Sequence, residues 1–303
     1  MSAAAIPRSR YVRCAGREIH VTEWGEPDAP VVVAWHGLAR TGRDMDPLAR
    51  YLADRWRVVC PDMLGRGLSQ WSPAPSEEYC LRFYARIAAD LFDALDIAQA
   101  HWIGTSMGGA IGTVAAAGLV EPALAGRIRS LLLNDNAPEL ATPALERIKT
   151  YAGRPPAFDT VSELEAFFRE VYRPYGWLGD AQWRHLTETS TRRLPDGRVT
   201  PHYDPEMVRQ FTDHADDYRL WDHYDRLRIP VLCLRGAASD LVLPETIQAM
   251  RGRGPGTAGL LKVVEVPGCG HAPALNVPDQ YALVDAFLAR VEQGAARPAN
   301  ANG

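Results

Sequence analysis

One serine of this chain lies in a pattern that could make its hydroxyl a nucleophile. Ser106 stands between Gly104 and Gly108, in the pattern G-x-S-x-G, after an apolar run and before an Ala- and Gly-rich segment. If a strand ends here and a helix begins, the serine occupies a very sharp turn in which glycines avoid Cβ clashes. The hydroxyl then stands above a sheet, and the Met107 N–H at the helix start can donate to developing negative charge. The alternative is a helix entry in which the serine serves only as a cap.

A serine nucleophile needs a base, and His271 is the best placed of the eight histidines. It follows the last apolar run of the chain, residues 261–266. Gly268 and Gly270 free the backbone before it, so that the imidazole can swing toward Ser106. We therefore expect His271 to be the catalytic base.

The base must be oriented by an acid, and the chain offers two aspartates for this role. Asp240 follows the apolar run at residues 231–235 and precedes His271 by 31 residues. We expect Asp240 to be the acid. Asp135, at the end of the run at residues 128–134, is the alternative, although an aspartate there could also be a turn or helix-cap residue.

A second donor for the oxyanion is expected in the loop that follows residues 31–34. The backbone N–H of Leu38 could act there together with that of Met107. His36, in the same loop, is interpreted as structural, because His271 already serves as base. The sequence shows no metal site and no phosphate-binding loop, so no cofactor is expected.

The elements that must position these residues alternate between strands and helices. Short apolar or alternating runs typical of strands occur at residues 11–14, 18–24, 31–36, 56–61, 101–104, 128–134, 231–235 and 261–266. Between them, segments such as residues 79–95 carry apolar side chains at helical spacing. This alternation predicts an α/β fold with a mostly parallel, eight-stranded sheet that is flanked by helices.

The alternation breaks between residues 136 and 228, where Pro, Arg and aromatic residues increase. Helical patterns in this segment predict a mainly helical cap, inserted after the sixth strand, that covers the site and selects the substrate. Its aromatic residues are interpreted mostly as the core of the cap, and its Arg and His residues leave a substrate carboxylate open. We expect a core domain of residues 1–135 and 229–293. Residues 294–303 are expected to form a flexible tail.

Composition and charge restrict the classes of function. The chain has 303 residues, with 33 Lys plus Arg against 37 Asp plus Glu and a net charge of −4. It has no long cationic run and no apolar stretch near the ~20 residues of a membrane span, so neither nucleic acid nor a membrane is expected as partner. Residues 1–14 lack the apolar core of a secretory signal, and five scattered cysteines without a C-x-x-C pair argue against disulfides. We expect a cytoplasmic protein that acts on a small molecule, as a monomer or a dimer.

Together these motifs resemble those of the α/β-hydrolase fold superfamily, in its capped form with a Ser-His-Asp triad. The resemblance rests on His36-Gly37, the segment of residues 62–69 (DMLGRGLS), the turn at Ser106, Asp240 and Gly270-His271. It implies a structural role behind the site for five residues of the second motif: Asp62, Gly65, Arg66, Gly67 and Ser69.

The resemblance also implies the catalytic roles, and these coincide with the assignments above. Ser106 would be the nucleophile, His271 the base and Asp240 the acid. Leu38 and Met107 would be the oxyanion donors. The serine excludes the haloalkane dehalogenases and epoxide hydrolases of this fold, which carry an aspartate at the nucleophile position.

The expected function is hydrolysis of a carboxylic ester or lactone of small to medium size through an acyl-enzyme. Two alternatives remain open. One is a C–C bond hydrolase of a diketone from aromatic degradation, although Ala272 stands where those enzymes commonly have Trp or Phe after the histidine. The other is a non-catalytic, ligand-binding member of the fold.

Overall fold

Apolar runs of the chain form one eight-stranded sheet in the computed structural model, which describes residues 6–295. Its strands are β1 (Arg8–Cys14), β2 (Arg17–Trp24), β3 (Val31–Trp35), β4 (Arg57–Pro61), β5 (Ala100–Thr105), β6 (Ile128–Asn134), β9 (Val231–Gly236) and β10 (Leu261–Val266). The central strands are almost wholly buried, as expected for strands that are covered on both faces. The predicted α/β fold with a mostly parallel sheet is confirmed.

The order of the strands decides which loops meet above the sheet. It is β1-β2-β4-β3-β5-β6-β9-β10. β2 is antiparallel to β1 and to β4, and all other neighbours are parallel. The carboxyl ends of β3, β5, β6, β9 and β10 therefore lie at the same edge, and β5 stands between β3 and β6.

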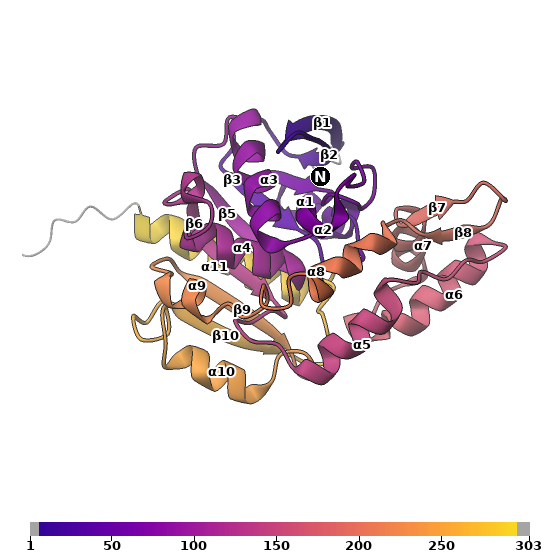
Figure 1. Ribbon diagram of the computed structural model, residues 1–303. Helices are drawn as coiled ribbons and strands as arrows, with labels where there is room; N and C mark the ends of the chain where they lie inside the picture. Colours follow the sequence, from indigo (N-terminus) through magenta and orange to yellow (C-terminus); the bar gives the residue numbers. More distant parts are fainter. Residues whose placement is uncertain (1–5, 296–303) are drawn as a thin grey trace, which may run out of the picture.

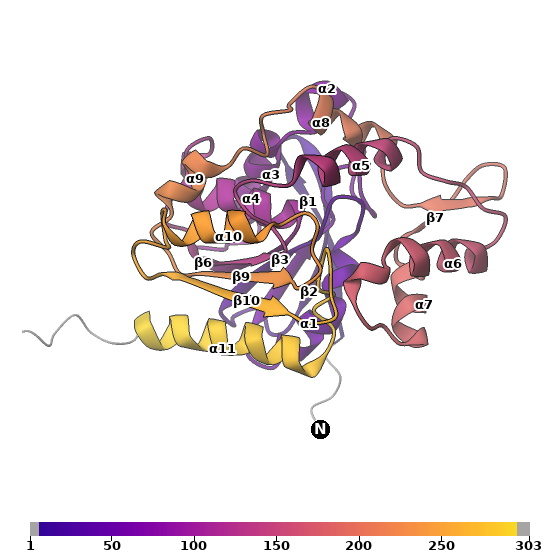
Figure 2. The same ribbon diagram turned by 90° about the horizontal axis from the view of Figure 1, so that it is seen from below.

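Helices cover both faces of the sheet (Figures 1 and 2). One face carries α3 (Leu81–Ala94), α4 (Met107–Ala117), α9 (Trp221–Arg226) and α10 (Pro244–Arg251), and the other carries α1 (Asp46–Leu52) and α11 (Pro278–Ala295). The spacing of Ile87 and Leu91 in α3 turns both side chains into the first of these cores. Shorter helical segments lie in the connections: η1 (Gly42–Met45), α2 (Pro75–Glu78) and η2 (Pro122–Leu124).

The segment between β6 and β9 is mainly helical, and its residues 142–201 project from the carboxyl edge of the sheet (Figure 1). It holds α5 (Thr142–Ala152), α6 (Val161–Val171), η3 (Arg173–Tyr175), α7 (Asp180–Glu188), β7 (Thr191–Arg193), β8 (Val199–Pro201), η4 (Pro205–Val208), α8 (Arg209–Thr212) and α9. Phe168 and Trp183 pack in a small core of its own. The capping box of Thr160 and Glu163 defines where α6 begins.

The remaining observations concern the chain as a whole. All five cysteines are buried. Nowhere in residues 6–295 does a helix combine the length and the apolar character that crossing a membrane requires. The tail expected at residues 294–303 lies almost wholly outside the described residues, because α11 extends to Ala295.

Candidate active site

Ser106 occupies the sharp turn that the sequence predicts between β5 and α4. Its backbone has φ 51° and ψ −117°, in the left-handed region that few residues other than glycine adopt. A Cβ on Gly108 would lie 2.4 Å from the Trp35 carbonyl oxygen, so the first turn of α4 can approach β3 only with glycine there. The strained turn holds the hydroxyl at the carboxyl edge of the sheet.

His271 lies within hydrogen-bond distance of the serine. Its Nε2 is 2.9 Å from Ser106 Oγ, and its Nδ1 is 2.7 Å from Asp135 Oδ2. An ionised carboxylate can only accept, so Nδ1 carries the proton and Nε2 can accept the serine proton. The loop after β10 thus delivers the imidazole to the serine, as expected from its position after the last strand.

The acid beside the imidazole is Asp135, and the expectation that Asp240 takes this position is wrong. Asp240 lies four residues beyond the end of β9, and its Oδ2 forms a 2.6 Å ion pair with Arg147. Both side chains of that pair are more than half exposed. The residue that sequence reasoning kept only as an alternative is therefore the one that meets His271.

The strand order explains why Asp135 is in place. β6 is hydrogen-bonded directly to β5, with Asn134 opposite Thr105, so Asp135 lies beside Ser106. The Asp135 carboxylate is fully buried and accepts three hydrogen bonds. Besides His271, the donors are the Gly236 N–H at 2.8 Å and the Ser239 hydroxyl at 2.7 Å. The sequence did not identify Ser239 as part of the site, although this residue lies next to Asp240.

Asn134 supports the loop that carries the histidine. Its side-chain amide donates to the Pro273 carbonyl at 2.8 Å and to Thr105 Oγ1 at 3.0 Å. One buried amide thus connects the ends of β5 and β6 to the backbone two residues after His271. No sequence motif indicated this contact, because it depends on which loops the fold brings together.

The two expected oxyanion donors lie on segments that a buried arginine ties together. Arg66 donates from Nε to the Leu38 carbonyl at 2.9 Å, and its Nη2 lies 3.6 Å from the Met107 sulfur. Leu38 belongs to the loop after β3, and Met107 is the first residue of α4. Their backbone N–H groups remain the candidates for an oxyanion hole.

His36 stabilises the loop after β3 through two hydrogen bonds. Its Nε2 accepts from the Met63 N–H at 2.9 Å, and its Nδ1–H donates to the Gly37 carbonyl at 2.6 Å. Burial lowers the pKa of this histidine to about 4, so the ring is neutral at neutral pH. Asp62 accepts from the Gly42 N–H at 2.6 Å behind this loop. These contacts agree with a structural role for both residues.

A cavity of about 490 Å³ opens onto the serine and the histidine. Leu38 and Arg40 line it from the core, and Tyr172 and Tyr175 line it from the segment between β6 and β9. A second cavity of about 560 Å³ adjoins it and shares Tyr175 and three other residues with it. The volumes suit a small organic molecule.

One group of side chains in residues 6–295 could hold a metal ion, and it lies outside this cavity. Its members are Cys80, His214 and Asp217, whose ligand atoms lie within 4.8 Å of one another. Burial raises the pKa of both the Cys80 thiol and the Asp217 carboxyl. The protonated forms of these groups bind metal poorly, and none of the three side chains lines the cavity at Ser106.

Known proteins resemble this chain over most of its length. A model of the family described as "Alpha/beta hydrolase family" matches residues 31–283. The 3-hydroxybutyrate-oligomer hydrolase of Cupriavidus necator is 39% identical over 299 residues, which cover 94% of this chain and 99% of that protein. The 2-(acetamidomethylene)succinate hydrolase of Mesorhizobium japonicum is 27% identical, over 87% of this chain and 88% of that protein.

A solved structure has a similar three-dimensional fold. An alpha/beta hydrolase from Novosphingobium aromaticivorans has a TM-score of 0.80 with this chain at 30% identity, and the match covers 95% of this chain and 100% of that one. Fold, motifs and relatives agree over nearly the whole length. The chain is therefore a hydrolase that belongs to the alpha/beta hydrolase family, as its motifs predicted.

Proposed function

We propose that the protein hydrolyses carboxylic esters through an acyl-enzyme formed on Ser106. The observation that carries the proposal is the continuous hydrogen-bonded path from Ser106 through His271 to the buried Asp135. A serine hydroxyl is a poor nucleophile until a base removes its proton, and here the base is aimed at it and oriented from behind.

The reaction follows from this arrangement. His271 Nε2 takes the Ser106 proton as Oγ bonds to the ester carbonyl carbon, and the carbonyl oxygen becomes an oxyanion. The imidazolium, held by Asp135, gives that proton to the leaving alcohol as the C–O bond breaks. A water molecule, deprotonated by the same imidazole, then cleaves the acyl-enzyme, and the serine recovers its proton.

We infer that the backbone N–H groups of Leu38 and Met107 hold the oxyanion. Met107 starts α4, where the N–H groups of the first turn have no partner within the helix. Leu38 lines the cavity from the loop after β3 and is fixed through its carbonyl by Arg66. Each donor of this kind contributes about 10²- to 10³-fold in turnover in a studied protease.

For the substrate we infer a short ester of a hydroxy acid. The support is the relative named a 3-hydroxybutyrate-oligomer hydrolase, whose similarity extends over 99% of its length. A cavity of about 490 Å³ accommodates a substrate of a few monomer units. The division into core and cap, the cytoplasmic location and the oligomeric state stay predictions.

The direct test is Ser106→Ala, with Ser162→Ala as a matched control on the exposed surface of α6. We expect Ser106→Ala to lose about 10⁴-fold or more in turnover of 4-nitrophenyl butyrate and of the 3-hydroxybutyrate dimer. Its melting temperature should stay near that of wild type, and a fluorophosphonate probe should label wild type and the control only.

The same panel separates the alternatives. A C–C bond hydrolase would turn over a diketone faster than either ester, because rate ratios report differential binding of the transition state. A ligand-binding member of the fold would leave the fluorophosphonate unreacted. Full esterase activity in Ser106→Ala would contradict the proposed mechanism.

A further inference from the structure

The loop that carries His271 is held by hydrogen bonds on both sides of the histidine. From the core, the Ala238 N–H donates to the Cys269 carbonyl at 2.9 Å, and the Asn134 side-chain amide donates to the Pro273 carbonyl at 2.8 Å. These two contacts engage carbonyl groups of the loop. The N–H groups of the same loop find their acceptors in a different part of the chain.

Those acceptors belong to η3, the short turn between α6 and α7 in the segment inserted between β6 and β9. The Gly270 N–H donates to the Pro174 carbonyl at 2.7 Å, and the Ala274 N–H donates to the Tyr175 carbonyl at 3.2 Å. The first donor stands immediately before His271, and the second stands three residues after it. Gly270 is buried, and buried N–H groups are almost always paired in native proteins. The loop of the base is therefore held between the core and η3.

Gly176, which directly follows η3, permits this close approach. Its backbone has φ 94° and ψ −151°, a conformation that is essentially restricted to glycine. A Cβ there would lie 2.7 Å from Cys269 Sγ, well inside the normal contact distance. A Cβ on Gly270 would likewise lie 3.1 Å from Pro174 Cβ. Glycine on each side of the contact thus lets η3 and the loop of the histidine meet, and a side chain at position 176 would push them apart.

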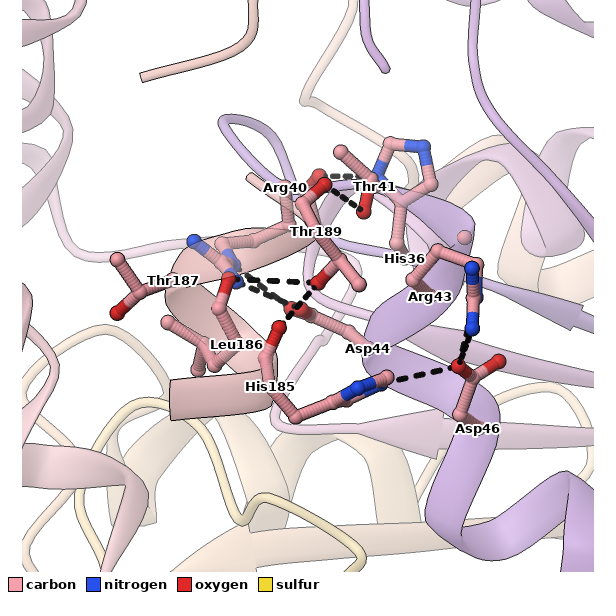
Figure 3. Close-up of polar contacts among 12 residues, drawn as sticks. His36, Arg40, Thr41, Arg43, Asp44, Asp46, His185, Leu186, Thr187 and Thr189 are labelled. Atoms are coloured by element: carbon pink, nitrogen blue, oxygen red, sulfur yellow. Dashed lines mark hydrogen bonds and ion pairs between the residues drawn. The ribbon is translucent and has the colours of Figure 1, made fainter. Parts of the chain in front are cut away.

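The inserted segment is fixed to the core on both sides of η3. Before η3, the Tyr172 ring lies 4.7 Å from the guanidinium of Arg40, which is itself paired with Asp44 at 2.7 Å (Figure 3). After η3, His185 Nε2 of α7 lies 3.0 Å from Asp46 Oδ2 of α1 (Figure 3). These contacts hold the two ends of the turn, so its carbonyl groups keep a defined place above the loop of the histidine.

A small displacement of this loop matters, because the imidazole must reach two partners at once. Nε2 of His271 is 2.9 Å from Ser106 Oγ, and Nδ1 is 2.7 Å from Asp135 Oδ2. Hydrogen bonds of this kind need donor–acceptor distances of about 2.7–3.2 Å, so a shift of about 1 Å breaks them. A misplacement of that size can lower the rate of an enzyme by about 100-fold.

We propose that η3 and Gly176 position His271 for catalysis, so that the inserted segment takes part in the reaction besides bordering the cavities. The inference rests on the proposed esterase function. Gly176 lines neither cavity and acts only through the loop of residues 269–274, so it is a positioning residue. Weakening its contact should slow the steps in which the histidine moves a proton and leave substrate binding nearly unchanged.

The test is Gly176→Ala, with Gly197→Ala as the matched control. Gly197 lies in the turn between β7 and β8 of the same inserted segment and has φ 92°, but a Cβ there would meet no atom within 4 Å beyond its chain neighbours. The control therefore also places an alanine at positive φ, without contact to the loop of the histidine. We expect Gly176→Ala to lose about 10- to 100-fold in kcat for 4-nitrophenyl acetate, with KM within about threefold of wild type. Gly197→Ala should keep both values.

Labelling with a fluorophosphonate separates a misplaced base from a partly unfolded protein. A misplaced histidine slows the labelling of Ser106 by a factor similar to the loss in kcat, but the labelling reaches the wild-type end point, because every molecule still presents the serine. We expect this result for Gly176→Ala. A lower end point reached at the wild-type rate would overturn the proposal, because it would show that the folded molecules have a correctly placed histidine.

Amide hydrogen exchange tests the contact in wild type, without any substitution. The N–H groups of Gly270 and Ala274 should be protected, and in Gly176→Ala both should exchange faster while the amides of β5 keep their protection. Rapid exchange of both groups in wild type would overturn the proposal, even where Gly176→Ala does not fold.

The remaining outcomes separate the explanations of a loss. A Gly176→Ala variant within about twofold of wild type in kcat and labelling rate would overturn the proposal. An equal loss in Gly197→Ala would assign the effect to strain in the inserted segment, and a raised KM with an unchanged labelling rate would assign η3 to substrate binding alone. Failure of the esterase function itself would show differently, as esterase activity that survives Ser106→Ala.

Discussion

Asp135→Asn is the substitution that tests the catalytic geometry most sharply. The Asp135 carboxylate accepts from His271 and Ser239 at Oδ2 and from the Gly236 N–H at Oδ1. An asparagine has one acceptor oxygen. With that oxygen toward His271, its NH₂ faces the Gly236 N–H. With the amide reversed, its NH₂ faces His271 Nδ1 and forces the proton to Nε2, where it blocks acceptance from Ser106.

Either orientation lowers the rate. In the first, the asparagine NH₂ cannot accept from the Gly236 N–H, so the side chain loses its fixed position. In the second, the imidazole carries its proton on Nε2 and cannot act as base for Ser106. The corresponding change in a serine protease lowers kcat by about 10⁴-fold, or about 5 kcal/mol of transition-state stabilisation. We expect a loss of this order for Asp135→Asn. Asp240→Asn should change kcat by less than about threefold, since an exposed pair with Arg147 contributes little.

The assay is steady-state hydrolysis of 4-nitrophenyl butyrate by wild type and both variants, with thermal melting as a check on folding. Asp135 is fully buried, so its variant should also melt at a lower temperature than wild type, whereas Asp240→Asn should not. An Asp240→Asn variant as inactive as Asp135→Asn, or an Asp135→Asn variant within tenfold of wild type, would refute the assignment.

Two further predictions concern residues around this centre. Ser239→Ala removes the hydroxyl that donates to Asp135, and it should lower kcat about tenfold while KM stays near wild type; an unchanged kcat in steady-state assays would exclude a positioning role. The second prediction concerns His36. The pKa of its imidazole is about 4 in the folded protein and about 6.5 in the unfolded chain. Between these pH values the unfolded state binds more protons, so the free energy of unfolding decreases as the pH falls. Urea unfolding of wild type should therefore show a loss of about 3 kcal/mol between pH 6.5 and pH 4, and His36→Gln should lack this component; equal pH slopes in both proteins would contradict it.

Periodicity predicted the fold because buried parallel strands need apolar side chains on both faces. The runs at β3, β4 and β6 were recognisable for that reason, and the break in periodicity after Asn134 is the basis on which the inserted cap is predicted. The same reasoning located Ser106 and His271, since a turn between glycines and a loop after the last strand are local features. What local patterns cannot predict is which strands become neighbours.

The acid illustrates this limit. Asp135 and Asp240 both follow strands, and chain order places both between the serine and the histidine. The decision depends on the direct pairing of β5 with β6, which puts Asp135 immediately beside the nucleophile, and on the four extra residues that carry Asp240 away from β9. Which aspartate reaches His271 is therefore determined by the order and register of the strands in the folded sheet.

Arg40 shows why the partners of a buried side chain are harder to predict than a nucleophile. Sequence reasoning left a substrate carboxylate open because the inserted segment contains Arg and His residues, and it chose no partner among them; it gave no role to Arg40, which belongs to the core loop after β3. Nothing in the residues around it predicts that Asp44 takes one edge of its guanidinium while Tyr172 covers its face. A nucleophile needs a local turn with a steric signature. The partners of a buried donor depend on every group that packs around it, so they can be predicted only after the fold is known.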